Sequence, residues 1–434
     1  MENRSILRGM ALVLVLGLGT PAEAQETALQ ELSAAARAAR NDGTAQAAYG
    51  RALLRAGRYR EAQVALQAAA RLSRRSPAAL YDVATVAFAR GDYRAARSAC
   101  GPLQRARDGA VLARVCNARA FLVWNRSARA FEELEAALAI DANNYEALLA
   151  LGDAHRLRAV VTDAEAAYRR AVAVRPDAAD PHVGLGLLYA AAERRDDAIR
   201  ELRAAAGLDR TNPEISYQLG KLLVGTPEAR QLLEAAVSGR PSWAEAQSAL
   251  GDALLAAGDA TAARQAFAHA IELNAQLAEA HSGLGRALLR LDDLAAAEAA
   301  LRRALELVPN APGAVGALAA VLARTDRLEE AFEQYGHAAD LDPRNPQPLL
   351  AAARLAVANR RDVLAAGFLD RILQQQSEQP QALALYGDIM LGRGDRTRAR
   401  QYYERALRGR LPAAEQARLR RALGTRATRP RPRR

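Results

Sequence analysis

Aromatic residues are scarce in this chain. They make up 5% of the 434 residues, whereas half of the residues are apolar and alanine dominates among them. Small apolar side chains with high helix propensity favour close-packed helices over sheet. A chain of this length has room for two or three ordinary domains or for one elongated array. The composition therefore predicts an all-α protein and leaves the number of domains open.

Motifs of the common catalytic sites are also missing. The chain contains no H-E-x-x-H, G-x-x-x-x-G-K-[ST], G-x-S-x-G or C-x-x-C sequence. The G-L-G sequences at 184–186 and 283–285 lack the third glycine of G-x-G-x-x-G and a preceding strand, so we interpret them as helix-packing positions. The sequence thus predicts no catalytic residue, no cofactor and no metal site.

Long hydrophobic runs are absent except for one short run near the N-terminus. Two arginines precede the apolar stretch 10–19, and residues 22–24 form an A-x-A cleavage site. The run is far shorter than the roughly 20 residues that span a bilayer. We therefore interpret residues 1–24 as a signal peptide cleaved near Ala24, and expect an exported, periplasmic protein. No cysteine follows the run, which argues against a lipoprotein; if the leader is misassigned, the protein is cytoplasmic.

The formal net charge of +11 is concentrated at the C-terminus. Residues 413–434 contain eight arginines and one glutamate. We expect residues 425–434 to form a disordered basic tail, because they have nothing to bury and contain two prolines. The tail is either a solubilising segment or a handle for anionic lipid, glycan or an acidic partner. Export makes nucleic acid the least favoured ligand, and we expect none.

Glycine and alanine recur with a period of 34 residues. Gly152, Gly186 and Gly220 follow this spacing, and Gly251 and Gly285 resume it after one step of 31. A second series has the same period with one step of 31, and it consists of Ala62, Ala96, Ala130, Ala164, Ala198, Ala229, Ala263, Ala297, Ala331, Ala365 and Ala399. A fixed period of this length indicates a repeat architecture.

Each period contains two amphipathic helices joined by a turn. Residues 145–158 and 163–174 carry small and apolar side chains at the i, i+3, i+4, i+7 spacing of one helix face. A glycine late in the first helix and an alanine early in the second allow the two helices to approach closely. Bulky residues four positions after the alanine are expected to fill the space between repeats, and include Tyr168, Phe267, Tyr335 and Tyr403.

This pattern resembles the tetratricopeptide repeat (TPR) family. The resemblance rests on leucine–glycine pairs such as Leu151-Gly152, on the alanine series, on the aromatic residue four positions later and on prolines that close several repeats. It covers eleven repeats in residues 43–412 and implies a right-handed superhelical solenoid. A helical segment at 25–42 precedes the array, and a capping helix at 413–424 follows it. Four repeats carry alanine instead of the glycine, and the bulky aromatic that the family favours earlier in the first helix is absent.

The sixth repeat, at about 213–243, is three residues short. Nine residues separate Gly220 from Ala229, where other repeats have twelve. Because three residues are close to one helical turn, we expect a first helix trimmed by one turn. Thr226 and Pro227 then predict the N-cap and first residue of the second helix.

In the family, the first helices line a concave face that binds peptide segments or helices of other proteins. The resemblance therefore implies a non-catalytic protein–protein interaction scaffold, here of the bacterial cell envelope. The alternative is the periplasmic TPR component of a polysaccharide or pilus export or assembly machine. An enzyme with an appended array is disfavoured, because eleven repeats leave only short ends. The corresponding groove positions are Arg51, Tyr81, Thr85, Phe88, Val115, Arg119, Asp153, Tyr217, Lys221, Arg286 and Arg354.

Two further features of the array bear on its ligands and its stability. Tyr81, Phe88, Val115 and Leu122 are expected to form the most apolar patch, and the residue pairs of the chaperone-binding carboxylate clamp are missing. The only cysteines, Cys100 and Cys116, lie at equal distances from Asp108 in a predicted turn. In an oxidising compartment they form a disulfide if their Cα atoms come within about 7 Å, and otherwise they are buried thiols. We predict the disulfide.

Overall fold

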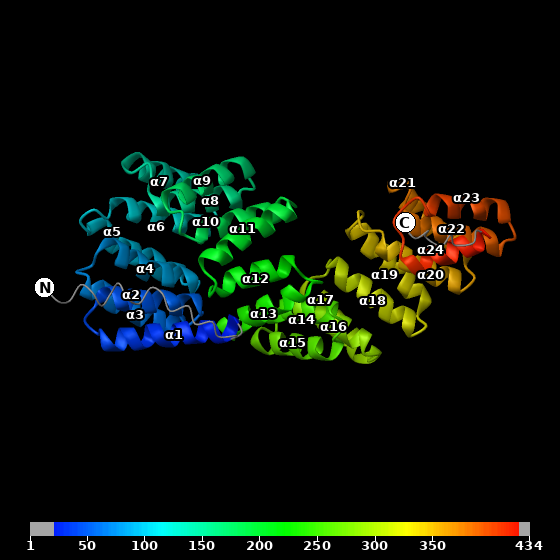
Figure 1. Cartoon of the computed structure of the whole chain (residues 1–434), viewed down its shortest axis with the longest axis horizontal. Helices are drawn as coiled ribbons and strands as arrows, with labels where there is room; N and C mark the ends of the chain where they lie inside the picture. Colours follow the sequence, from blue (N-terminus) through cyan, green and yellow to red (C-terminus); the bar gives the residue numbers. More distant parts are fainter. Residues whose placement is uncertain (1–20, 425–434) are drawn as a thin grey trace, which may run out of the picture. The chain divides into compact units, whose positions relative to one another are not determined.

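The computed structural model describes residues 21–424, with side chains from residue 27, and this part of the chain contains 24 α-helices and no strand (Figure 1). Most of the predicted signal peptide and the predicted basic tail therefore lie outside the described residues. The helices divide into two compact units, residues 1–258 and 259–434. No helix in the described range is long and apolar enough to span a membrane.

The first unit is built from a leading helix and the helices of repeats one to six, followed by the first helix of repeat seven. Its helices are α1 (Pro21–Ala38), α2 (Gly43–Arg55), α3 (Tyr59–Leu72), α4 (Pro77–Ala89), α5 (Tyr93–Arg105), α6 (Ala110–Val123), α7 (Ser127–Ile140), α8 (Tyr145–Leu157), α9 (Val161–Val174), α10 (Asp180–Ala191), α11 (Arg195–Leu208), α12 (Pro213–Leu222), α13 (Pro227–Gly239) and α14 (Ala244–Ala256).

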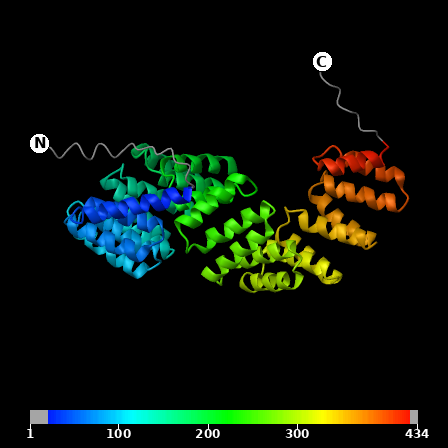
Figure 2. The ribbon, with the colours of Figure 1, turned by 60° about the horizontal axis from the view of Figure 1, so that its bottom comes forward.

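The second unit continues with the same alternation of helices, drawn from green to red in Figure 2. Its helices are α15 (Ala260–Leu273), α16 (Ala278–Arg290), α17 (Leu294–Leu307), α18 (Pro312–Arg324), α19 (Leu328–Leu341), α20 (Gln347–Ala358), α21 (Asp362–Gln375), α22 (Pro380–Gly392), α23 (Arg396–Ala406) and α24 (Ala413–Ala422). Within each unit, consecutive helices pack on each other, so the fold is an all-α repeat solenoid, as the sequence predicts.

The periodic alanines are buried in the core. Each of the eleven is at most 2% exposed. The periodic glycine faces the residue four positions after the alanine: a Cβ atom on Gly152 would lie 2.5 Å from the Tyr168 ring, and one on Gly186 would lie 2.6 Å from Cγ of Leu202. The period in the sequence therefore records which positions of a helix pair leave no room for a larger side chain.

The turn between the two helices of a repeat has a fixed backbone conformation. Its residue at the position of Gly57 has positive φ in repeat after repeat, including Gly91, Asn125 and Ala159. This left-handed conformation ends the first helix, and glycine adopts it without steric cost. Non-glycine residues are held in it by the packing of the two helices.

The sixth repeat is shortened as predicted. Its first helix, α12, has 10 residues, whereas the other first helices have 12 to 14. The side chain of Thr226 caps α13 by accepting a hydrogen bond from the backbone N–H of Ala229 at 3.3 Å, and Pro227 is the first residue of that helix. Both parts of the prediction are confirmed.

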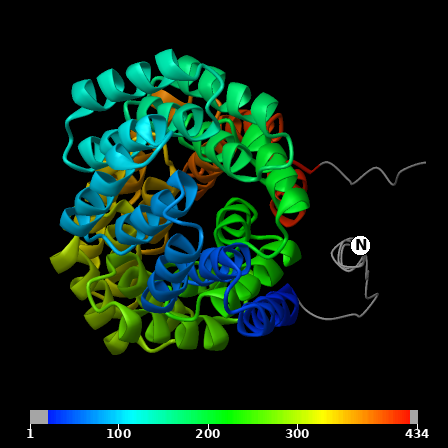
Figure 3. The ribbon, with the colours of Figure 1, turned by 90° about the vertical axis from the view of Figure 1, so that its left-hand side faces the viewer.

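A contact with the N-terminal helix closes the first unit on itself. The N-terminal helix α1 packs against α13 as well as against α2, so the beginning of the array lies beside its sixth repeat (Figure 3). Arg240, which follows α13, donates a hydrogen bond from Nη2 to the carbonyl oxygen of Arg55 at 3.1 Å, across 185 residues of sequence. Arg55 in turn forms an ion pair with Asp209 at 3.2 Å. The six repeats of this unit therefore surround an interior space.

Candidate partner-binding cavity of the first unit

A cavity of about 1300 Å³ lies inside the first unit. The first helices of repeats one to six (α2, α4, α6, α8, α10 and α12) contribute most of its lining, together with the loops that lead into them. The second helices, which alternate with them, contribute few lining residues. The helix alternation written in the sequence therefore determines which residues face the cavity.

The lining of this cavity is strongly charged, with an excess of acidic residues. Five arginines contribute to it, namely Arg51, Arg55, Arg119, Arg175 and Arg240. Nine carboxylates also contribute, namely Asp82, Asp108, Asp141, Glu146, Asp153, Asp177, Asp180, Asp209 and Glu214. The cavity is thus acidic in a chain whose total charge is positive.

Each lining arginine is held by contacts within the chain. Arg51 pairs with Asp82 at 2.8 Å, and the hydrogen bond between them raises the pKa of the guanidinium. Arg175 pairs with Glu146 at 3.5 Å and lies over the Tyr145 ring, 4.1 Å from its centroid. With Arg55 on Asp209 and Arg240 on a backbone carbonyl, the positive charges of the cavity are already bound.

Arg119, in repeat three, covers two aromatic residues of repeat two. Its Nη1 donates to the Tyr81 hydroxyl at 3.1 Å, and its guanidinium lies 5.2 Å from the centroid of the Phe88 ring. Burial of Tyr81, which is 8% exposed, raises the pKa of its phenol. Thr85 donates its hydroxyl to the Tyr81 carbonyl oxygen at 3.0 Å. These side chains form a preorganised polar surface over an aromatic base.

The predicted apolar patch at these repeats needs a correction. Val115 is 0% exposed and belongs to the core, because its helix α6 packs against α4, α5, α7 and α8 and the face that carries Val115 is covered. With Arg119 over Tyr81 and Phe88 as well, the open apolar surface expected from the sequence is replaced by a guanidinium on aromatic rings.

The acidic end of the cavity is formed by α8 and α10. Asp180 begins α10 and forms no ion pair with any described residue. The cavity wall partly desolvates this carboxylate, which raises its pKa. Arg55 and the Tyr145 hydroxyl oppose this shift, whereas Asp209 and Asp153 add to it. Burial likewise raises the pKa of Glu146 although Arg175 lies beside it.

The Tyr145 hydroxyl lies at the same end of the cavity, beside Asp180. The Tyr145 side chain is 5% exposed, and its hydroxyl is buried without a direct hydrogen bond to the described part of the chain. The ring lies in the cavity lining, and the Asp180 carboxylate lies beside the hydroxyl. The hydroxyl and this carboxylate interact, so a group bound to one of them would also lie near the other.

The structure brings together five of the predicted groove residues, Arg51, Tyr81, Thr85, Arg119 and Asp153, around this cavity. The Asp153 carboxylate accepts a hydrogen bond of 2.7 Å from the Tyr168 hydroxyl. The other predicted residues lie outside the cavity lining, namely Phe88, Val115, Tyr217, Lys221, Arg286 and Arg354.

Those other residues have their own surroundings. Tyr217 is 9% exposed and packs on Trp243 with 4.4 Å between ring centroids. Lys221 is exposed, with Nζ 5.0 Å from the centroid of the Tyr217 ring. Arg286 and Arg354 belong to the second unit. Within the first unit, the predicted groove positions therefore do not all line the cavity.

Sequence reasoning missed the acidic residues that matter most here. Glu146, Asp180 and Glu214 are spaced by 34 residues, and each precedes a predicted or equivalent groove position by seven residues, which is about two helical turns. In α4, α6, α8 and α10, the same helix face thus carries two lining positions seven residues apart. Applying the repeat period two turns earlier along the helix would have found them.

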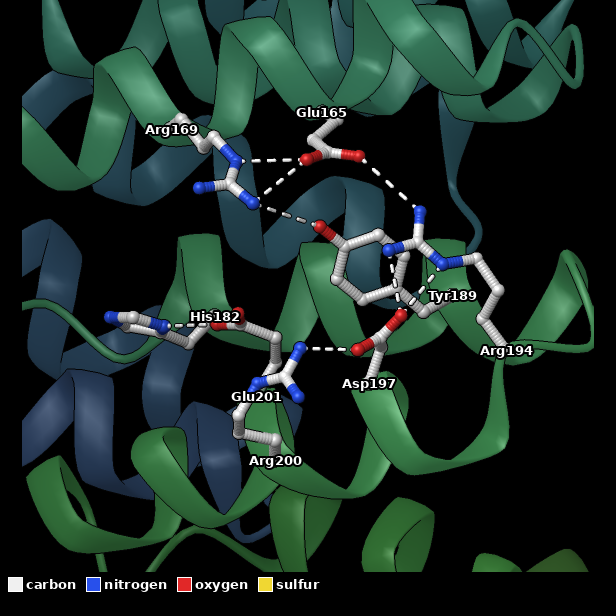
Figure 4. Close-up of polar contacts among 8 residues, drawn as sticks. All are labelled: Glu165, Arg169, His182, Tyr189, Arg194, Asp197, Arg200 and Glu201. Carbon is white, nitrogen blue, oxygen red and sulfur yellow. Dashed lines mark hydrogen bonds and ion pairs between the residues drawn. The ribbon is translucent and has the colours of Figure 1, made fainter.

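A second polar cluster lies among α9, α10 and α11 (Figure 4). Arg194 pairs with Glu165 at 3.6 Å and with Asp197 at 2.6 Å, and His182 Nδ1 lies 2.8 Å from Glu201 Oε2. Hydrogen bonds from arginines lower the pKa of Asp197. None of these residues lines the cavity. The cluster links neighbouring repeats, and we interpret it as structural.

Cys100 and Cys116 form a disulfide bond, with 5.7 Å between their Cα atoms. The bond joins α5 to α6 and so ties the second repeat to the third. Within the described residues, no group of three or more histidine, cysteine, aspartate or glutamate side chains is placed to hold a metal ion.

Stacked helix pairs with a period of 34 residues and a cavity lined by the first helix of each pair define a solenoid repeat protein. The chain belongs to the tetratricopeptide repeat family. Family models described as tetratricopeptide repeat match residues 48–109, 161–213 and 225–278, and a further one matches 254–322. Repeats of this family generally form non-catalytic scaffolds that bind other proteins.

Solved structures of TPR-rich proteins show partial similarity. Yeast Tom70 aligns with a TM-score of 0.47 and 14% identity, over 88% of this chain and 95% of that chain. A tetratricopeptide repeat protein from Parabacteroides merdae aligns with a TM-score of 0.46 and 16% identity, over 56% of this chain and 98% of that chain. A thermophilic TPR protein of Thermus thermophilus aligns with a TM-score of 0.37 and 24% identity, over 42% of this chain and 100% of that chain. Comparison with curated protein sequences finds no match.

Proposed function

We propose that this protein is an exported scaffold of the bacterial cell envelope that binds segments of partner proteins in the cavity of its first unit. The observation that carries the proposal is the cavity itself, about 1300 Å³ in volume and lined by the first helices of six successive repeats. Pockets for small molecules are typically 300 to 1,000 Å³ and mostly apolar. A larger cavity with a charged lining suits a polypeptide segment.

The chemistry of the lining supports a binding role. Arginines are fixed by ion pairs and aromatic contacts, and the Tyr81–Arg119 pair is ordered before any ligand arrives. Preorganised groups of this kind lose little conformational entropy on binding. Charged groups in fixed positions also give specificity for a complementary partner.

Two features support export. The leader at 1–24 has the charge, the apolar core and the cleavage sequence of a signal peptide. The only two cysteines are joined in a disulfide, and disulfides persist in oxidising compartments such as the periplasm. The leader sequence and the disulfide therefore both support an envelope location.

The proposal is tested by site-specific photo-crosslinking in intact cells. A photoreactive amino acid at Leu149 or Thr85, which line the cavity, should capture partner proteins. The matched control positions are Glu132 and Val64, which are exposed in the same unit but outside the lining. Equal capture from all four positions, or no capture from the cavity, would refute the proposal.

The same experiment decides between the two envelope roles. Captured polysaccharide-synthesis enzymes or pilus subunits would identify the protein as a component of an export or assembly machine. Captured proteins of other classes would leave the general scaffold role. Fractionation and N-terminal sequencing of the mature protein test export directly, with a mature chain beginning at Gln25 as the expected result.

A further inference from the structure

We infer that the segment bound in this cavity is extended and arginine-rich, with guanidinium groups bound by the carboxylates that successive repeats place in the cavity lining. The inference rests on the proposed function and adds the chemistry of the partner. Its central residue is Asp180, with Glu146 and Glu214 in the repeats on either side.

The first argument is the spacing of the acidic residues. Glu146, Asp180 and Glu214 occupy the same phase of repeats four, five and six, and all three line the cavity. Helices packed on each other, as α8 and α10 are, lie about 8–10 Å apart. An extended polyproline-type segment advances about 3.1 Å per residue, so side chains three residues apart are separated by roughly 9 Å. Arginines three residues apart would therefore match the carboxylates of Glu146 on α8 and Asp180 on α10.

The second argument is the pair of polar groups without a cationic partner at the centre of this series. Asp180 has no ion pair with a described residue, and the buried Tyr145 hydroxyl beside it interacts with that carboxylate but with no other described hydrogen-bonding group. A guanidinium has five N–H donors in one plane, enough for a carboxylate and a phenol oxygen together. Burying both polar groups under an apolar ligand would instead leave them unsatisfied, at a cost in affinity.

The third argument is the charge balance of the lining. Nine carboxylates and five arginines line the cavity, and every one of those arginines already has a partner in the chain. Arginines outside the lining pair with two of the carboxylates, Asp108 and Asp153, which still leaves more carboxylates than arginines. An acidic segment would therefore have to displace existing ion pairs and would meet the surplus carboxylates. A basic segment neutralises the surplus, and this complementarity selects it over an acidic one.

The probe for the test is a fluorescently labelled peptide with the sequence of residues 425–434, TRATRPRPRR, which carries Arg426 and Arg429 three residues apart and two prolines. Its binding is measured by fluorescence anisotropy to the full chain and to a chain ending at Gly424, which removes competition from the chain's own segment. We expect saturable binding that weakens as salt screens the charges. A peptide with glutamine in place of all five arginines should not bind.

The protein variants locate the interaction. Asp180→Asn should weaken peptide binding about tenfold or more, because it removes the unpaired carboxylate at the centre of the series. Glu132→Gln, an exposed carboxylate of α7 outside the cavity, should leave affinity unchanged. Circular dichroism melting of both variants verifies that they fold. Equal affinity of Asp180→Asn and the unaltered protein, or equal binding of the glutamine peptide, overturns the inference.

The failure of this inference is distinguishable from failure of the proposed function. If the cavity positions capture partners in cells but those partners bind through segments without arginine or lysine, the scaffold role stands and the inference is overturned. If the peptide binds in an Asp180-dependent manner while the cavity captures no partner in cells, the inference is supported and the scaffold role fails.

Discussion

Gly283 lies directly against the ring of Phe267: a Cβ atom built on Gly283 would be 2.1 Å from Cε1 of that ring. Phe267 is fully buried. The same relationship joins Gly184 to Tyr168, at 2.4 Å. The first glycine of each G-L-G sequence therefore makes room for the aromatic residue of the preceding repeat.

This relationship predicts a coupled effect of two substitutions. Gly283→Ala should destabilise the protein by about 1–3 kcal/mol, because the added methyl group overpacks the contact with Phe267. Phe267→Leu should destabilise it through lost packing, but the double variant should lose less than the sum of the two single losses. Urea denaturation followed by circular dichroism measures all four proteins.

The chain offers a matched glycine as a control. A Cβ atom on Gly316, inside α18, would have no neighbour closer than 3.8 Å. Gly316→Ala should therefore stabilise the protein, by about 0.5–1 kcal/mol, through helix propensity alone. Similar effects of Gly283→Ala and Gly316→Ala would show that the close contact with Phe267 is not the reason for the glycine.

The sequence predicted the fold because its determinants are local and repeat. The alanine series and the glycines report contacts between neighbouring helices, so their spacing in the sequence is the spacing of the packing. The cavity was predicted only in part. Arg51, Arg119 and Asp153 were found because one phase of the repeat was carried along the first helices.

The remaining parts of the site depend on contacts that a period does not record. Val115 was wrongly expected in the groove, because its exposure depends on how many helices surround α6. Arg240 and Asp209 became part of the site only because the first unit closes on itself, and the hydrogen bond from Arg240 to Arg55 spans 185 residues. A contact made once in the chain leaves no periodic signal.

The closure of the first unit should depend on Arg240. Its guanidinium donates to the Arg55 carbonyl and lies 4.3 Å from the Trp243 ring centroid, and its aliphatic part lies against Gly57. Arg240→Ala should weaken the contact between α13 and the first repeat by about 1–2 kcal/mol. Hydrogen exchange should accelerate in α1 and α2 and stay unchanged in α22.

A second arginine on the same helix provides the comparison. Arg230 pairs with Glu234 within α13, and both side chains are about half exposed. Such surface pairs contribute roughly 0.3–0.5 kcal/mol. Arg230→Ala should therefore leave hydrogen exchange in α1 and α2 at the rate of the unaltered protein, and a faster rate there would show that closure does not depend specifically on Arg240.

The disulfide should stabilise the second and third repeats. It closes a loop of 16 residues, for which the chain-entropy model gives about 3 kcal/mol. Replacing Cys100 and Cys116 together with alanine should lower the melting temperature, and a reducing agent should lower that of the unaltered protein but not that of the variant. Thiol labelling of protein isolated from the periplasm should find no free cysteine. Two reactive thiols in that sample would contradict both the bond and its compartment.

The raised pKa values of Glu146 and Asp180 predict how stability depends on pH. A carboxyl group whose folded pKa lies above its unfolded value binds more protons in the folded state between those two values. Its contribution to stability is therefore complete below the unfolded pKa and is lost as the pH rises through the folded pKa. For these two groups the loss begins above the ordinary carboxyl values of 3.8 for Asp180 and 4.5 for Glu146.

The double variant Glu146→Gln, Asp180→Asn removes both titrations, so the change in its melting temperature between pH 4 and pH 7 isolates their contribution. Relative to the unaltered protein, it should become progressively more stable as the pH rises, because only the unaltered protein must ionise two partly desolvated carboxylates next to Asp153 and Asp209. Arg55 and Arg175, which oppose these shifts, are present in both proteins. A stability difference that stays constant over this pH range would mean that the cavity wall does not desolvate these carboxylates, and their demand for a bound cation would disappear with it.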